Sequence, residues 1–333
     1  MPQRLRVIQL GLGPIGLEAA RLTFSRSDLE LAGAVDVDPR LGGRDLGDLL
    51  EIPDRTGVIV QSDLASALER ERPDIVFQTT GSRLADVMGQ IEQVVRHGAN
   101  LASTTEELFF PHRRHPAEAG RIDSLAREHG VSVLGTGVNP GFAMDTLALC
   151  LSAVCRRIDS VSIRRVVDAM TRRAPLQRKI GAGLPVEEFR AKVARKELGH
   201  VGLVESLDLL AAVLGLVVDE VEETIEPVVA TQAIRTSHAS VEPGQVAGIH
   251  HTALGRSAGS LRISLDLRMY LGAPSPHDEI AIEGDPPIRN RVEGGIAGDA
   301  ATAAILVNCA GGVVAAPPGL RTIAEVPLIT CGT

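Results

Sequence analysis

The sequence predicts an α/β protein with a Rossmann-type, doubly wound parallel sheet, into which an α+β domain with a mixed or antiparallel sheet is inserted. The first half of the chain alternates short apolar runs with helical patterns, which is typical of a parallel sheet. The segment Leu261–Leu271 alternates strictly between apolar and polar residues, which indicates a half-buried strand of another sheet. After Gly294-Gly295 the chain returns to a helical pattern, which we expect to pack on the first domain.

The composition supports a two-domain globular protein. The chain has 333 residues, of which 44% are hydrophobic and 23% charged, with a formal net charge of −8. The negative charge argues against nucleic acid as a partner, because a phosphate backbone needs a clustered basic face. We see neither a signal peptide nor an unbroken apolar run of the ~18 residues that a membrane span requires. The sequence therefore predicts a cytoplasmic protein that does not bind a membrane.

The cysteines give no sign of a metal site. Cys150, Cys155, Cys309 and Cys331 form no CxxC pair and have no histidine at metal-finger spacing. We expect free thiols, mostly buried, and no bound metal.

The elements of the first half follow from the apolar runs and the helical periods between them. Strands are predicted at Arg4–Leu10, Leu29–Val35, Val58–Val60, Asp74–Thr79, Asn100–Ser103 and Val131–Gly135. Helices are predicted at Ile15–Ser25, Leu64–Arg70, Leu84–His97 and Ala117–His129.

The pattern changes after Met144. Strands are predicted at Asp159–Asp168, Val221–Ala230, Val246–Leu254, Leu261–Leu271 and Glu279–Glu283, and helices at Pro185–Leu198, Gly202–Gly215 and Gly298–Cys309. A loop rich in proline and glycine is expected to follow the last helix. We therefore expect residues 1–144 with 296–333 to form a dinucleotide-binding domain, and residues 145–295 to form a domain for substrate binding and dimerisation.

A glycine-rich turn follows the first predicted strand and opens the first helix. Its sequence is Gly11-Leu12-Gly13-Pro14-Ile15-Gly16. In the dinucleotide fingerprint the first glycine permits a tight turn, the second lets a pyrophosphate approach the backbone, and the third lets helix and strand pack closely. An ordinary strand-to-helix turn can look the same. Asp36, which follows the second predicted strand twenty residues after Gly16, completes the fingerprint as a ligand of the adenosine ribose.

The choice between NAD and NADP stays open. Asp36 favours NAD, because a carboxylate bonds the ribose 2′-hydroxyl and repels a 2′-phosphate. Arg40 and Arg44 are close enough in sequence to hold that phosphate if the loop folds over. Use of both cofactors is consistent with this pattern.

The ends of the next strands carry polar residues that are candidates for the reacting end of the cofactor. Thr79-Thr80-Gly81 and Thr104-Thr105 are candidate cofactor ligands, because ligands of open α/β sheets lie beyond the carboxyl ends of the strands. Glu106 and Glu107 follow directly, and a carboxylate there suits an ammonium substrate, whose proton it can accept. Alternatively, both acids begin a helix and complement its dipole.

Other polar residues have weaker signals. Asn139, in Asn139-Pro140-Gly141, is a candidate catalytic and cofactor-binding residue, because its amide keeps its charge during turnover, although such residues also suit a connecting turn. His250 and His251 are neighbours in an alternating segment, so we expect one to face the core and the other solvent. His200 and Lys179 are less favoured candidates, and Lys179 would act as a base only if it were buried.

Several motifs, in order along nearly the whole chain, resemble the 2,4-diaminopentanoate dehydrogenase family, a group that includes native amine dehydrogenases. The motifs are Gly11–Gly16, Ala34–Pro39 with Gly42-Gly43, Ser103–Leu108, Gly137–Phe142, Lys179–Gly183 with Glu187–Phe189, Gly199–Leu203, and Gly298–Thr302. The N-terminal domain is also similar to dihydrodipicolinate reductase. In that enzyme a His-His pair is followed by a lysine and by a Pro-Ser-Gly-Thr loop that grips a dicarboxylate. Here His250-His251 runs into Thr252-Ala253-Leu254-Gly255-Arg256, so that carboxylate clamp is missing.

The resemblance implies an NAD(P)-dependent amine dehydrogenase that deaminates an amine or diamine to a ketone or aldehyde plus ammonia, and runs in reverse as reductive amination. It implies a homodimer and a glutamate in the Ser103–Leu108 turn that binds the amine nitrogen, which we assign first to Glu106 and second to Glu107. It does not identify the amine.

Two other functions stay open. An amino-acid dehydrogenase or imine reductase of the dihydrodipicolinate reductase, homoserine or aspartate dehydrogenase type would need a cation for the substrate carboxylate, and Arg165, Arg172 or Lys179 could serve. A dinucleotide-binding sensor without turnover would use the same fold.

Overall fold

The computed structural model describes residues 4–53 and 55–332. The chain divides into two compact units, each with its own sheet. Unit 1 comprises Met1–Gly141 and Ala297–Thr333, and unit 2 comprises Phe142–Ile296.

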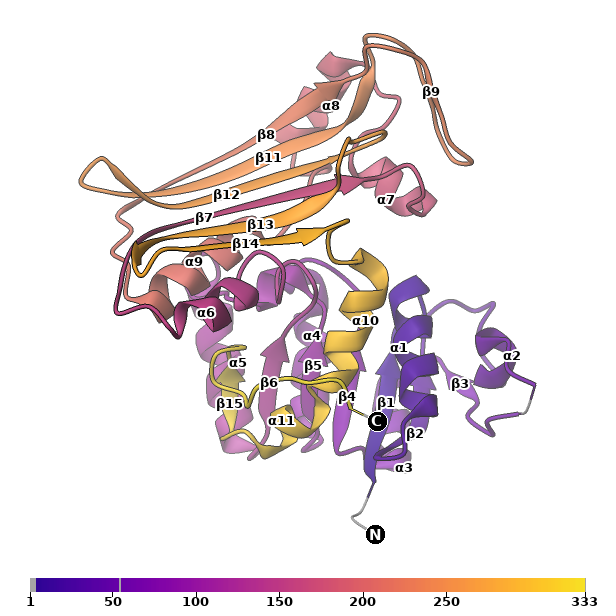
Figure 1. Ribbon diagram of the computed structural model, residues 1–333. Coiled ribbons are helices and arrows are strands. Elements are labelled where there is room, and N and C mark those ends of the chain that lie inside the picture. The colour runs from indigo at the N-terminus through magenta and orange to yellow at the C-terminus, as the bar shows by residue number, and fades with distance from the viewer. Residues whose placement is uncertain (1–3, 54, 333) are drawn as a thin grey trace. The chain divides into compact units, whose positions relative to one another are not determined.

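Unit 1 is built on a seven-stranded sheet with the strand order β15-β6-β5-β4-β1-β2-β3, in which every neighbouring pair is parallel (Figure 1). Its strands are β1 Leu5–Leu10, β2 Leu29–Val35, β3 Val60–Gln61, β4 Ile75–Gln78, β5 Asn100–Ser103, β6 Ser132–Gly135 and β15 Gly319–Arg321. The predicted fold class is thereby confirmed for this unit.

The helices of unit 1 connect these strands and lie on the sheet. They are α1 Pro14–Ser25, α2 Leu46–Leu50, α3 Leu64–Glu71, α4 Leu84–Arg96, α5 Pro116–Glu128, α10 Gly298–Asn308 and α11 Ala310–Ala315, with the short 3₁₀ helix η1 at Glu106–Leu108. The core strands are apolar on both faces, as strands between two helix layers must be: Ile75, Val76 and Phe77 are fully buried.

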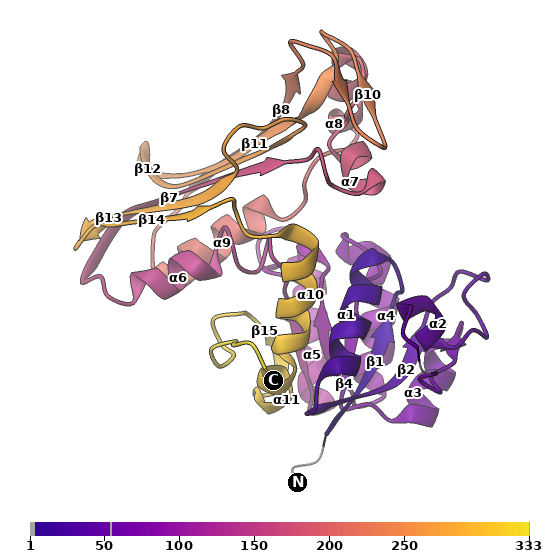
Figure 2. The same cartoon turned by 45° about the vertical axis from the view of Figure 1, so that its right-hand side comes forward.

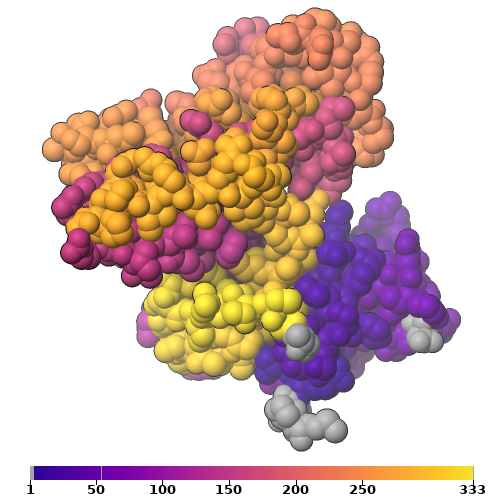
Figure 3. All heavy atoms as spheres, in the orientation of Figure 1, coloured from indigo at the N-terminus to yellow at the C-terminus, as the bar shows by residue number. Residues whose placement is uncertain are grey.

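The C-terminal part of the chain returns to unit 1, as the sequence suggested. Helix α10 lies beside α1 in both ribbon views, and Arg26 Nη1 donates to Asn308 Oδ1 at 2.9 Å (Figures 1 and 2). In the space-filling view the yellow C-terminal residues lie against the indigo residues of the first helix (Figure 3). The prediction of a loop after α10 is wrong in part, because α11 and the edge strand β15 lie in that stretch of the chain. β15 is only three residues long, which leaves no periodicity to detect.

Unit 2 contains a mixed six-stranded sheet in the order β14-β13-β7-β12-β11-β8, where only β7 and β12 pair in parallel. Its strands are β7 Arg157–Asp168, β8 Glu220–Val229, β11 Val246–Ser257, β12 Ser260–Tyr270, β13 His277–Asp285 and β14 Ile288–Glu293, with a small ribbon of β9 Ile234–Arg235 and β10 Ser240–Val241. Its helices are α6 Thr146–Ser152, α7 Ala174–Lys179, α8 Val186–Ala194 and α9 Leu203–Leu214.

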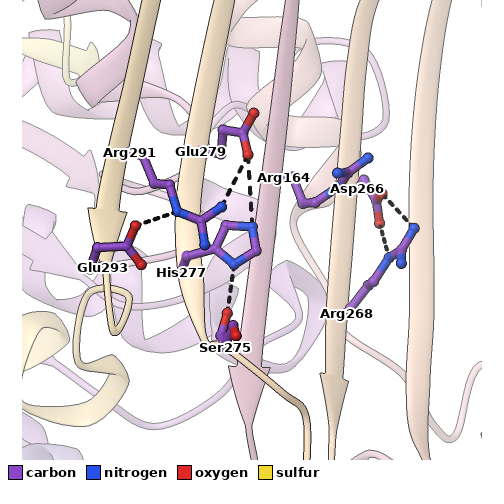
Figure 4. A network of polar contacts seen from close by, with 8 residues as sticks. All are labelled: Arg164, Asp266, Arg268, Ser275, His277, Glu279, Arg291 and Glu293. Carbon is purple, nitrogen blue, oxygen red and sulfur yellow. Dashed lines mark hydrogen bonds and ion pairs between the residues drawn. The ribbon is translucent and has the colours of Figure 1, made fainter.

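The two faces of the unit 2 sheet differ in polarity, as period-two patterning requires. Ile263, Leu265 and Leu267 of β12 are fully buried on the face that α9 contacts. The opposite face carries partly exposed charged side chains. Figure 4 shows eight residues of this network: Arg164, Asp266, Arg268, Ser275, His277, Glu279, Arg291 and Glu293.

A buried ion pair joins β7 to β13 in unit 2. Arg165 and Asp278 are 3% and 1% exposed, and Arg165 Nη1 lies 2.5 Å from Asp278 Oδ2. Arg165 Nη2 also donates to the Ile296 carbonyl at 2.7 Å, and the Ile296 amide donates to Asp278 Oδ2 at 2.7 Å. Since the guanidinium is held by these groups, Arg165 is a structural residue of unit 2.

The four cysteines differ in how far they are exposed to solvent. The cysteines are free, as expected, but the expectation that most are buried is wrong: Cys309 is buried, Cys155 is intermediate, and Cys150 and Cys331 are exposed.

Among the described residues, one helical stretch, Gly298–Ala315, is long and apolar enough to cross a membrane by those two criteria alone. In unit 1 its residues Leu306 and Val307 are fully buried.

The contact of β6 with η1 gives a test of the fold. A Cβ on Gly135 would lie 2.6 Å from both Leu108 C and Phe109 N, whereas a Cβ on Gly120 in α5 would meet nothing within 4 Å. We expect Gly135→Ala to destabilise the protein by ~1–3 kcal/mol, because backbone must move to admit the methyl group. The melting temperature should fall by several degrees in calorimetry. Gly120→Ala is the matched control, and it should raise stability slightly. Equal melting temperatures for the two variants would contradict the packing described for β6.

Candidate active site

The candidate site lies along the carboxyl edge of the unit 1 sheet. Because the strands are parallel and ordered β2-β1-β4-β5-β6, the loops that follow them meet this edge in the same order. Asp36 follows β2, the glycine turn follows β1, and Glu106 lies beyond β5. Three strand spacings of ~4.8 Å separate β2 from β5, about 14 Å in all. The predicted ligands thus form one row.

The glycine turn has the geometry that the fingerprint requires. Gly11 has φ +90, and a Cβ on Gly16 would lie 1.9 Å from the Gly11 carbonyl oxygen, so α1 begins directly against the end of β1. A Cβ on Gly13 would meet nothing within 4 Å. The backbone of Gly13 therefore has open space at the point where we expect the pyrophosphate.

The first turn of α1 is suited to an anion. Pro14 and Ile15 open the helix, Gly13 provides no side-chain cap, and no acidic residue lies in the first turn. Amides at a helix N-terminus without a side-chain cap bind phosphate groups well. These features fit a dinucleotide pyrophosphate.

Asp36 is tied to the glycine turn. Its Oδ2 accepts from the Leu12 amide at 2.6 Å, and its Oδ1 accepts from the Asp38 amide at 2.8 Å. The carboxylate is therefore fixed in position beside the turn, and each oxygen keeps a lone pair for a ribose hydroxyl.

Hydrogen bonds join the end of β4 to its neighbours. Thr79 Oγ1 donates to the Gly11 carbonyl at 2.9 Å and accepts from Gln9 Nε2 at 3.0 Å. Thr80 Oγ1 donates to Gln90 Oε1 at 2.6 Å, while Gly81 accepts from Thr105 Oγ1 at 3.0 Å. The hydroxyls of Thr79 and Thr105 thus hold loops together, so these residues support the site through the loop backbone.

The strand end of β5 is fixed in the same way. Buried Ser103 Oγ donates to Gln78 Oε1 at 2.8 Å and accepts from the Thr105 amide at 3.1 Å. The Thr104 amide donates to the Gln78 carbonyl at 3.0 Å, and Thr104 is partly exposed. Gln9 and Gln78 were not singled out from the sequence, whereas Ser103 belongs to the Ser103–Leu108 turn that was. The only signal for Gln9 and Gln78 is that polar residues stand in otherwise apolar strands.

The structure distinguishes the two glutamates. Glu107 Oε2 accepts from the Leu84 amide at 2.8 Å, at the first residue of α4, and lies 3.4 Å from His115 Nε2. The Glu107 amide also donates to the Ser82 carbonyl at 3.3 Å. Glu107 therefore caps a helix that follows the β4 loop, and it joins three segments of unit 1. Glu106 precedes it as the first residue of η1 and is partly exposed.

Asn139 presents a buried amide beyond β6. Within the described part of the chain, neither Asn139 Oδ1 nor Nδ2 has a hydrogen-bond partner, although both atoms are buried. Thr136 Oγ1, three residues earlier, is in the same state. Gly137 and Gly141 shape this loop, because a Cβ on Gly141 would lie 2.2 Å from the Gly137 carbonyl oxygen. Buried polar atoms without partners are uncommon, and a functional role is one of the reasons for them.

The histidines considered from the sequence, His200, His250 and His251, lie in unit 2 and are not among the predicted ligands of unit 1. As expected, one of the pair faces the core: His251 is fully buried with Nε2 3.0 Å from Glu223 Oε1, while His250 is partly exposed and lies 2.9 Å from Asp266 Oδ1. Burial, with the nearby charge of Lys179, holds the pKa of His200 well below its ordinary value, so its ring is neutral at pH 7.

No group of three or more histidine, cysteine or acidic residues in 4–53 and 55–332 could hold a metal ion.

The chain is similar to known proteins along nearly its whole length. A family model described as the 2,4-diaminopentanoate dehydrogenase C-terminal domain matches residues 142–332. A 2,4-diaminopentanoate dehydrogenase of Acetoanaerobium sticklandii is 30% identical over 98% of this chain and 94% of its own length. An amine dehydrogenase of Streptomyces virginiae is 25% identical over 96% of this chain and 95% of its own.

A solved structure is also similar over the full length. The amine dehydrogenase from Mycobacterium smegmatis superposes with a TM-score of 0.88 at 26% identity, covering 99% of this chain and 98% of that one. These matches confirm the family resemblance, the fold class and the use of a nicotinamide dinucleotide that the sequence predicted. The chain belongs to the 2,4-diaminopentanoate dehydrogenase family and is an NAD(P)-dependent oxidoreductase that acts on CH–NH2 groups.

Proposed function

We propose that the protein catalyses the reversible oxidative deamination of an amine or diamine to a ketone or aldehyde plus ammonia. The observation that supports this most directly is that Glu106 and Asn139 follow the adjacent strands β5 and β6, and that the buried Asn139 amide has no hydrogen-bond partner among the described residues. The relatives named as amine and diamine dehydrogenases agree with it.

Glu106 is proposed as the residue that binds the amine nitrogen. A carboxylate attracts the ammonium form of the substrate and accepts the proton that must leave before hydride transfer. The nicotinamide, when bound, supplies or accepts the hydride. Once that proton has passed to solvent, the same carboxylate can take a proton from the water that attacks the iminium carbon and return it to the nitrogen of the resulting carbinolamine, so that the C–N bond breaks and ammonia leaves.

Asn139 is proposed to orient the reacting end of the site. Its amide has donors and an acceptor but no charge to change during turnover. Bonding to the cofactor or the substrate would satisfy both buried atoms, which have no partner among the described residues. The rest of the dinucleotide would be held by the glycine turn and by the acid after β2, that is, by Gly11, Gly13, Pro14, Ile15, Gly16 and Asp36.

An amino-acid substrate is less well supported. Of the three cations considered for a substrate carboxylate, Arg165 is engaged by Asp278 and the Ile296 carbonyl. A sensor without turnover would not need Glu106 at the nicotinamide end. We propose a cytoplasmic enzyme, since its four cysteines are free thiols.

The function is tested by an ammonia-dependent NAD(P)H oxidation screen over short ketones, aldehydes and keto acids, with wild type and Glu106→Gln side by side. We expect simple carbonyl compounds to be reduced only with ammonia present. Glu106→Gln should lower kcat by at least about 100-fold, because the amide cannot accept the proton, while cofactor affinity stays within a few-fold. Unchanged turnover in the variant, or a preference for keto acids, would contradict the proposal.

Glu107 should behave differently, because it holds the loops around Glu106. Glu107→Gln keeps an oxygen for the Leu84 amide and should retain most activity. Glu107→Ala leaves the first turn of α4 without its cap, which typically costs ~1 kcal/mol, and should lower both melting temperature and kcat. Thermal denaturation and kinetics of both variants check this. If Glu107→Gln is as inactive as Glu106→Gln is expected to be, the roles of the two glutamates are reversed.

We also propose a homodimer formed through the charged face of the unit 2 sheet shown in Figure 4. The ion pairs on this face include Arg164 with Asp266 and Arg291 with Glu293. A face that carries both signs of charge suits contact with a second copy of itself.

Light scattering should therefore give twice the chain mass of 35.1 kDa. The double variant Arg164→Glu with Arg291→Glu should dissociate the dimer, because it gives the face an excess of negative charge. Arg70→Glu, an exposed charge reversal in unit 1, is the control and should not alter the mass. A monomeric wild type would refute the dimer, and a dimeric double variant would refute this interface.

A further inference from the structure

The loop after β2 contains a second acid that faces an arginine. The chain runs Asp36-Val37-Asp38-Pro39-Arg40 from the end of the strand. Asp38 and Arg40 form an ion pair within this loop: Arg40 Nε lies 2.9 Å from Asp38 Oδ1, and Arg40 Nη2 lies 2.6 Å from Asp38 Oδ2. The guanidinium therefore presents two of its donors to one carboxylate, which is the strongest geometry for such a pair.

Backbone contacts fix the carboxylate of this pair. The Arg40 amide donates to Asp38 Oδ1 at 2.9 Å, and the Asp38 amide donates to Asp36 Oδ1 at 2.8 Å. The Leu41 amide donates to the Asp38 carbonyl at 3.0 Å, which closes the turn. Asp36, in turn, is bonded to the Leu12 amide of the glycine turn. The two carboxylates are thus linked through backbone at the adenosine end of the proposed dinucleotide site.

The Asp38 carboxylate stays ionised at neutral pH. Its hydrogen bonds from Arg40 lower its pKa to about 2. Its side chain is 27% exposed and that of Arg40 is 87% exposed, so the pair is accessible to solvent and by itself stabilises the fold little. The pair matters because it sets the charge that a ligand meets. Arg40 is the cation nearest to Asp36 in sequence, and its charge is already balanced by Asp38.

This arrangement bears on a ribose 2′-phosphate. Such a group carries a charge of about −1.5 to −2 and needs a cation that is free to bind it. Here it would approach two carboxylates and would have to take Arg40 from Asp38. A ribose 2′-hydroxyl needs only an acceptor, which Asp36 provides. We propose that Asp38 determines cofactor specificity, because it holds Arg40 within the loop and so makes the protein prefer NAD over NADP.

The proposal rests on the dinucleotide site proposed at the glycine turn, so its test measures binding without any amine or carbonyl substrate. Dissociation constants of NADH and NADPH are measured by nicotinamide fluorescence for wild type, Asp38→Asn, Arg40→Ala and the double variant Asp38→Asn with Arg40→Ala. Asp48→Asn, which removes an exposed acid from the first turn of α2, is the matched control. Melting temperatures confirm that each variant is folded.

We expect wild type to bind NADH at least about 10-fold more tightly than NADPH, and Asp38→Asn to tighten NADPH by about 5- to 10-fold, as one newly available charge-assisted bond would. The Asp38→Asn change should leave NADH within about 2-fold. The gain should disappear in the double variant, because it requires Arg40. Asp48→Asn should leave the ratio unchanged.

Three results would overturn the proposal. The first is a wild type that binds NADPH as tightly as NADH. The second is a double variant that keeps the full gain, since the effect would then be loss of negative charge without release of Arg40. The third is an Asp38→Asn variant whose ratio of NADPH to NADH dissociation constants equals that of wild type. If Arg44→Ala then weakens NADPH binding, the exposed Arg44 is the phosphate ligand instead of Arg40. A wild type that binds neither nucleotide would refute the glycine-turn site itself, and normal binding without amine turnover would refute only the proposed reaction.

Discussion

The contact between the end of β1 and the start of α1 is the one on which the rest of the site depends. A side chain on Gly16 would lie 1.9 Å from the Gly11 carbonyl oxygen, so only glycine lets the helix begin so near the strand. This closeness brings the amides of the first helical turn to the carboxyl edge of the sheet. Thr79 holds the contact from the neighbouring strand through its bond to the same carbonyl. Every later ligand is positioned relative to this point by the parallel register of the strands.

At the reacting end, the positions of the loops depend on side chains that bond across neighbouring strands. Glu107 is the clearest case, since it caps α4 and contacts His115 from the loop before α5. Successive residues of a 3₁₀ helix point about 120° apart, because three residues make one turn. With the Glu107 side chain directed to α4, Glu106 must point elsewhere. The doubled Glu-Glu therefore combines one residue that holds the loops with one that they present.

The sequence predicted the parallel half of the fold well, because buried strands between helices leave continuous apolar runs such as Ile75-Val76-Phe77. It did not predict β14, in which Arg289, Arg291 and Glu293 give a polar pattern on an exposed edge. Helices such as α2 and α7 are one or two turns long, which is too short for periodicity to appear. Their formation depends on tertiary contacts that no local pattern records.

In the candidate site, too, residues whose role is set by local sequence could be predicted, and residues whose role depends on tertiary contacts could not. The glycines and Asp36 could be identified from sequence because their role is set by local backbone geometry. The difference between Glu106 and Glu107 could not, since it depends on α4, more than twenty residues away in the chain.

The two ends of the site also differ in how far the protein satisfies its own polar groups. At the adenosine end, Asp36 and Asp38 are held by backbone amides and by Arg40, so the charges are arranged before any ligand arrives. At the other end, the Asn139 amide is buried without a partner among the described residues. Leaving a buried amide unpaired costs about 1–3 kcal/mol, which a ligand that bonds it returns as affinity. A rigid adenosine end therefore suits selection of the cofactor, and an unsatisfied reacting end suits tight contact with the groups that change during the reaction.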